Sequence, residues 1–114
     1  MKRILSVLLL LVLALSLLVG CGNSRKYHQP DITLTLAGDY GDLIIREWVD
    51  GDTNGAEVYL KNGKGETLLG ETSGTSDGSL PFSENNYTFE QTGKKIVLRW
   101  KNVDDWKSKT FMVP

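Results

Sequence analysis

Apolar side chains occupy alternate positions in a series of short runs from Asp31 to the end of the chain. Ile32, Leu34 and Leu36 alternate with threonines, and this spacing is typical of a strand with one buried face. The same period-two pattern, or a short apolar run between turn residues, predicts further strands. These predicted strands cover residues 42–49, 56–61, 66–69, 80–82, 87–90, 96–101 and 106–113.

Turn residues separate these runs and indicate how the strands connect. Asn62-Gly63 and Thr92-Gly93 each lie between two runs and predict tight hairpins, because Asn and Gly tolerate a positive φ. No window beyond the first twenty residues has the 3.6-residue periodicity of an amphipathic helix. Seven to eight short strands in one unit, residues 31–114, predict an all-β fold: a small antiparallel β-sandwich or β-barrel. The pattern alone does not separate the two.

The first twenty residues have a different pattern. Lys2 and Arg3 precede an apolar run, residues 4–19, that contains only two serines. A helix that spans a bilayer needs about 20 mostly apolar residues, so this run is short for a transmembrane anchor. Its length and basic start favour the apolar core of a secretory signal peptide.

Leu18, Val19, Gly20 and Cys21 follow one another as two apolar residues, a small residue and the single cysteine. This order resembles the lipobox of bacterial lipoproteins. The resemblance implies that the Cys21 sulfur carries a diacylglycerol thioether and that the signal peptide, residues 1–20, is removed. It also implies a lipid-anchored protein on the outward face of the cell membrane. Polar residues 21–30, which end in Pro30, then predict a lipidated N-terminus and a flexible tether.

Charge and cysteine content exclude several classes of function. Without Lys2 and Arg3, eleven basic side chains face 14 acidic ones, which argues against nucleic-acid binding. The one cysteine is assigned to lipid, so the domain is expected to fold without a disulfide. No glycine-rich loop joins a strand to a helix, so nothing indicates nucleotide binding.

The segment Asp50-Gly51-Asp52-Thr53-Asn54-Gly55 has oxygen ligands at alternate positions followed by glycine. It resembles the start of an EF-hand calcium loop, and Asp50, Asp52 and Asn54 are therefore candidate Ca²⁺ ligands. Lys61 occupies the position where that motif needs a bidentate carboxylate. The flanking residues also predict strands rather than helices, so a β-hairpin loop is the competing interpretation.

Residues 74–78 match the G-x-S-x-G pattern of hydrolases around Ser76. That motif requires a strand that turns sharply into a helix, and Ser79, Leu80 and Pro81 do not predict one. The only histidine, His28, lies in the predicted tether, where it cannot be positioned as a base. The chain is therefore predicted not to be an enzyme.

Aromatic side chains are the remaining candidates for recognition. Trp100 alternates with Ile96 and Leu98 and is expected in the core, whereas Trp48, Tyr59 and Trp106 could form a binding surface or fill the core as well. Trp48 is ambiguous because it shares its face with an apolar and a charged residue, and Tyr59 is expected to be exposed because it lies between two charged residues. The sequence thus predicts a non-enzymatic binding module whose partner is an envelope protein or glycan. The alternative is a carrier that holds a small ligand in a barrel interior, or calcium in the 50–54 loop.

Overall fold

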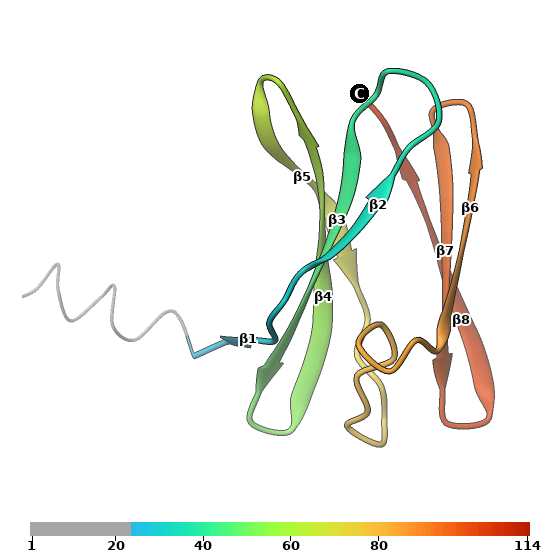
Figure 1. Ribbon diagram of the computed structural model, residues 1–114. Coiled ribbons are helices and arrows are strands. Elements are labelled where there is room, and N and C mark those ends of the chain that lie inside the picture. The colour runs from blue at the N-terminus through green and yellow to red at the C-terminus, as the bar shows by residue number, and fades with distance from the viewer. Residues whose placement is uncertain (1–23) are drawn as a thin grey trace, which may run out of the picture.

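The computed structural model describes residues 24–114, and within them it has eight strands and no helix (Figure 1). The candidate lipidation site Cys21 and the predicted signal peptide lie outside the described residues. The strands are β1 (Lys26–Tyr27), β2 (Ile32–Thr35), β3 (Asp42–Asp50), β4 (Thr53–Asn62), β5 (Gly65–Thr72), β6 (Tyr87–Thr92), β7 (Lys95–Asn102) and β8 (Asp105–Met112).

A five-stranded antiparallel sheet forms one layer of the molecule. Its order is β1-β3-β4-β5, and β2 pairs with the same edge of β3 as β1 does. The register sets Leu43 opposite Leu60 and Ile45 opposite Val58. Because successive side chains point to opposite faces of a strand, these apolar pairs all lie on one face of the sheet.

A three-stranded antiparallel sheet, β6-β7-β8, forms the other layer. Ile96 lies opposite Phe111, and Leu98 lies opposite Phe89, so this sheet also has one apolar face. The two apolar faces pack against each other, and Trp100 is among the largest side chains buried between them. The prediction that Trp100 belongs to the core is confirmed.

The fold is a small β-sandwich, which resolves the choice that the sequence left open. The two sheets meet at their edges through side chains and not through a continuous backbone ladder. On one side, the Gln91 amide exchanges two hydrogen bonds with the backbone of Ala37. On the other side, Lys109 Nζ donates to the carbonyl oxygen of Glu71 at 2.6 Å.

The connection between the two sheets differs from the prediction. Residues 80–82, predicted as a short edge strand, instead belong to the irregular segment from residue 73 to residue 86 that crosses between the layers (Figure 1). The Phe82 side chain fills the core, while its backbone N–H donates to the Glu47 carboxylate instead of to a strand. Pro81 has no N–H for a ladder, which agrees with this arrangement.

The strand β1 comes from the segment predicted as a tether. Lys26 and Tyr27 pair with Val49 and Trp48, so the chain lies along β3 well before Asp31. A two-residue strand is too short to show period-two alternation, and the sequence pattern therefore did not reveal it.

Candidate functional site

The three aromatic residues predicted to form a binding surface lie on opposite faces of the sandwich. Trp48 and Tyr59 occupy the outer face of the five-stranded sheet, whereas Trp106 occupies the outer face of the three-stranded sheet. Because the whole core separates the two faces, these residues cannot contact one small ligand together.

Trp48 lies on an outer face but is covered by the first described residues of the chain. The guanidinium carbon of Arg25 lies 4.0 Å from the centroid of the indole ring, and Trp48 is only 9% exposed. Directly across the ladder is Gly55, where a Cβ would stand 2.9 Å from the indole Cζ2 atom. The indole ring therefore packs between Gly55 and the Arg25 guanidinium, and it is not open for stacking on a ligand.

Glu57 is the centre of a hydrogen-bond network beside Trp48. Its Oε2 atom accepts from Arg25 Nη1 at 2.8 Å and from the Tyr27 hydroxyl at 3.0 Å. Its Oε1 atom accepts from the Tyr59 hydroxyl. Arg25 also donates to Glu71 at 2.5 Å. This network fixes the chain's first strand to the sheet.

A second arginine covers the neighbouring part of the same face. Arg46 donates through Nε and Nη2 to the Asp31 carboxylate, the shortest distance being 2.8 Å. The hydrogen bonds that Arg46 donates to Asp31 raise the pKa of Arg46 above its ordinary value. Its guanidinium carbon lies 4.8 Å from the centroid of the Tyr59 ring. Tyr59, predicted to be exposed, is therefore half-buried.

The Glu57 network predicts a stability that depends on pH. Burial raises the pKa of Glu57, but its three hydrogen-bond donors outweigh burial and hold that pKa below its ordinary value of 4.5. A carboxyl whose pKa is lowered by folding stabilises the protein fully above its ordinary pKa. That stabilisation is lost as the pH falls through the folded-state value.

Replacing Glu57 with glutamine should therefore lower the free energy of unfolding by about 1–2 kcal/mol at pH 7. The difference from the wild-type protein should shrink as the pH is lowered below about 4.5, measured by urea unfolding at each pH. Glu84→Gln is the control, because Glu84 is exposed and lies outside this network. A Glu57→Gln deficit that stays constant down to pH 3 would contradict the prediction.

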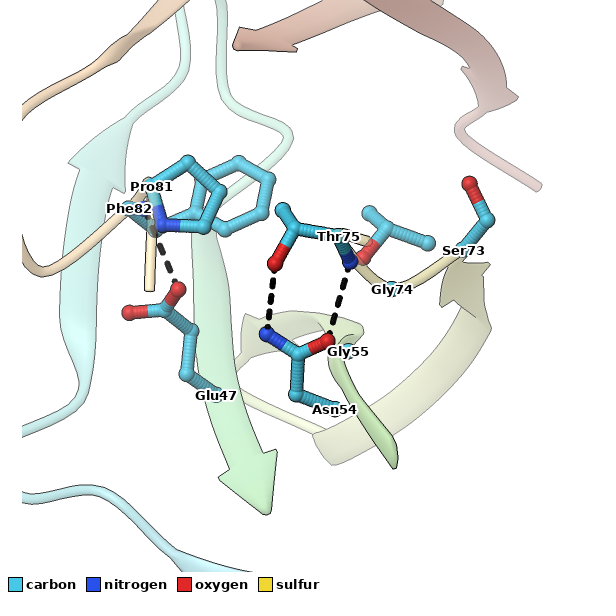
Figure 2. A pocket seen from close by; sticks show the side chains of 9 residues that line it. Glu47, Asn54, Gly55, Ser73, Gly74, Thr75, Pro81 and Phe82 are labelled. Atoms are coloured by element: carbon cyan, nitrogen blue, oxygen red, sulfur yellow. Dashed lines mark hydrogen bonds between the residues drawn. The ribbon is translucent and has the colours of Figure 1, made fainter. Parts of the chain in front are cut away.

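The three candidate calcium ligands lie in or beside the turn of the β3–β4 hairpin, but their side chains do not point to one place. Asn54 turns inward, where its Nδ2 atom donates to Thr75 Oγ1 at 3.0 Å and its Oδ1 atom accepts from Thr75 N at 2.9 Å (Figure 2). Asp50 accepts a hydrogen bond from Ser24 Oγ at 2.8 Å, and Asp52 lies in the exposed turn. Residues 24–114 contain no cluster of three or more acidic, histidine or cysteine side chains suited to a metal ion. A calcium site stays a prediction, with Asp50 and Asp52 as its remaining candidate ligands.

The G-x-S-x-G segment forms a loop next to the β7–β8 hairpin. Ser76 uses both its backbone N–H and its hydroxyl to bond Asn102 Oδ1, at 2.9 Å and 3.2 Å. His28 is exposed in the segment after β1, and its backbone N–H donates to the Glu47 carbonyl oxygen at 2.7 Å. Ser76 thus has an amide as its partner and not a base.

Glu47 is a structural residue that sequence reasoning missed. It is 3% exposed and lies on the core face of β3. Its carboxylate accepts from the backbone N–H of Phe82 at 3.1 Å and from that of Ser83 at 2.6 Å, and also from the Ser83 hydroxyl. The sequence feature that could have revealed this role is a carboxylate at an inward position between Ile45 and Val49. A carboxylate buried there needs strong hydrogen-bond partners.

Trp106 is the one candidate aromatic residue that is largely open to solvent, at 54% exposure. It lies at the start of β8, directly opposite Lys101 on β7.

Comparison with known protein families, with curated proteins and with solved structures finds no match. Within the described residues, no helix has the length and apolar character needed to cross a bilayer.

Proposed function

We propose that this chain is a lipid-anchored extracytoplasmic lipoprotein whose β-sandwich is a non-enzymatic binding module. The observation that carries the proposal is the order Leu18-Val19-Gly20-Cys21 at the end of a basic and then apolar leader. A single acyl chain binds membranes only marginally, whereas the two chains of a diacylglycerol hold a protein firmly.

The structure supports a domain held close to the membrane. Ser24 is already bonded to Asp50, and only Gly22 and Asn23 separate it from Cys21. Because an extended chain spans at most about 3.6 Å per residue, Ser24 lies within about 11 Å of the lipidated residue. The end of the sandwich that carries the β3–β4 hairpin is therefore nearest to the headgroups.

Two features favour binding at a surface over catalysis or transport of an enclosed ligand. Within residues 24–114 the hydroxyl of Ser76 bonds the Asn102 amide oxygen, so the serine of the hydrolase-like motif is not paired with an activating base there. The hollow lined by Glu47, Asn54 and Phe82 leaves no room for even one water molecule (Figure 2). A carrier that encloses a small ligand needs room between the sheets, which this hollow does not supply, and we therefore prefer an interaction module. Calcium binding by the 50–54 loop is a separate prediction.

Intact-mass analysis of the protein purified from its native host tests the anchor. We expect residues 1–20 to be absent and the mass of a diacylglyceryl group to be present on Cys21. Cys21→Ser should lack that added mass, whereas the control Ser24→Ala should keep it. A free thiol at Cys21 with residues 1–20 still attached would overturn the proposal.

A further inference from the structure

The outer face of the three-stranded sheet combines exposed cations, hydroxyls and an exposed tryptophan. Alternation along the three strands defines this surface, which we call the basic face. Its members are Thr88, Glu90, Thr92, Lys95, Val97, Arg99, Lys101, Trp106, Ser108, Thr110 and Met112. All of them except the half-buried Val97 are exposed.

The cations of the basic face lack carboxylate partners. Every ion pair within residues 24–114 involves one of two arginines that lie over the outer face of the other sheet, Arg25 and Arg46. Lys95, Arg99 and Lys101 form none, and Glu90 is the only acidic residue among the outward positions of the basic face. The protein therefore neutralises its outward arginines on one sheet and leaves three cations available on the other.

The same difference appears in the charge of the two halves of the chain. Residues 24–83 contain five basic and ten acidic side chains, whereas residues 84–114 contain six basic and four acidic ones. An anionic ligand is therefore repelled by the half that contains the five-stranded sheet and attracted to the basic face. This charge complementarity indicates the sign of the partner.

The position of Trp106 indicates the chemistry of the partner beyond its charge. Trp106 is directly opposite Lys101, and Arg99 is the next outward residue on β7. Outward residues on a strand repeat about every 6.7 Å, so the two cations and the indole can contact neighbouring units of one polymer. An exposed indole can stack on a sugar ring and donate its N–H, and Ser108 next to Arg99 can bond sugar hydroxyls.

We propose that the basic face binds an acidic polysaccharide, with Trp106 stacked on a sugar ring and Arg99 and Lys101 paired with carboxylates. An arginine guanidinium fits a carboxylate through two parallel hydrogen bonds. This inference rests on the proposed function, because it names the ligand class of that binding module.

A protein partner fits this surface less well. Its two large exposed apolar side chains, Trp106 and Met112, lie six residues apart on β8, which is about 20 Å. A stable protein interface needs a contiguous apolar centre.

A lipid surface fits less well for a different reason. β1, which follows the anchor, pairs on the other sheet, on the far side of the sandwich from the basic face (Figure 1). The short link from Cys21 to Ser24 thus holds the five-stranded sheet, rather than the basic face, next to the anchor.

Binding of polygalacturonate to the full chain in detergent micelles, followed by tryptophan fluorescence and calorimetry, tests the inference. We expect binding that weakens as salt is raised, because exposed charges are screened. Arg99→Gln and Lys101→Gln should each weaken binding about threefold, and Trp106→Ala about fivefold. These residues are exposed, so the melting temperature should not change.

The matched control is the double variant Lys61→Gln/Lys64→Gln, which removes two exposed cations near the turn that joins β4 to β5. Its affinity for polygalacturonate should equal that of the wild-type chain. Absence of wild-type binding, or equal losses in the control and the basic-face variants, would overturn the inference. Equally tight binding of poly-glutamate would also overturn it, because charge alone would then explain the affinity.

The two proposals fail in different ways. A chain with the expected lipid mass on Cys21 that does not bind polygalacturonate contradicts the inference about the basic face alone. A chain without that lipid contradicts the proposed function, whatever its affinity for the polymer.

Discussion

Replacing Gly74 with alanine is expected to lower the free energy of unfolding by about 3 kcal/mol. A Cβ atom at Gly74 would overlap the backbone carbonyl oxygen of Asn54 and stand 2.6 Å from the Asn54 Oδ1 atom. Asn54 lies on β4 and pairs with Val49 of β3, so its backbone cannot move without disturbing that ladder. The loop would instead have to lift away, and it would then lose the two hydrogen bonds between Asn54 and Thr75.

Gly63→Ala is the matched control, because a Cβ at Gly63 meets no atom within 4 Å and its φ is not in the left-handed region. Its free energy of unfolding should stay within about 0.5 kcal/mol of the wild-type value. Urea unfolding followed by tryptophan fluorescence measures both variants. Equal effects at the two glycines, or a loss below about 1 kcal/mol at Gly74, would contradict the prediction.

This prediction gives the G-x-S-x-G segment a structural explanation. The first glycine of the segment is required because the loop passes directly against the β4 backbone. The serine, by contrast, is exposed and bonded to Asn102, so its hydroxyl contributes little to stability. The segment thus matches a catalytic pattern for a structural reason, since a tight crossing between two sheets needs small residues.

The strands and much of the core could be predicted from the sequence, because alternation is a local property. Ile96, Leu98 and Trp100 all lie in the core, as their spacing indicated. Both predicted hairpins are present, since Asn62 pairs with Gly65 and Thr92 pairs with Lys95 across two-residue loops. Gly93 has the expected positive φ, whereas the positive φ expected at Asn62 or Gly63 is found at Gly65 instead. The choice between sandwich and barrel depends on how distant strands meet, and period-two spacing contains no information about that.

The candidate site was less predictable because its contacts join distant parts of the chain. Arg25 contacts Trp48, Glu57 and Glu71, up to 46 residues away, and it comes from a segment with no apolar alternation. Trp48 was therefore ambiguous and Tyr59 was expected to be exposed. Trp106 is exposed, because it lies on the outer face of the edge strand β8 and no distant part of residues 24–114 buries it.

Replacing Glu47 with alanine is expected to lower the free energy of unfolding by about 3 kcal/mol. The substitution removes the acceptor for the buried N–H of Phe82 and the part-buried N–H and hydroxyl of Ser83. A buried donor without a partner costs about 1–3 kcal/mol, and hydrogen bonds to a charged group are the stronger ones. The segment that leads into β6 would then lose its only polar attachment to β3 among the described residues.

Ser83→Ala separates the carboxylate from the rest of this contact. It deletes one hydroxyl donor but leaves both backbone N–H groups bonded to Glu47, so its cost should be about 1 kcal/mol. Urea unfolding of both variants and of the double variant gives the coupling between the two side chains. If Glu47→Ala costs no more than Ser83→Ala, the carboxylate does not hold the connection between the sheets. Packing of Phe82 against Trp100 and Tyr87 would then have to hold it instead.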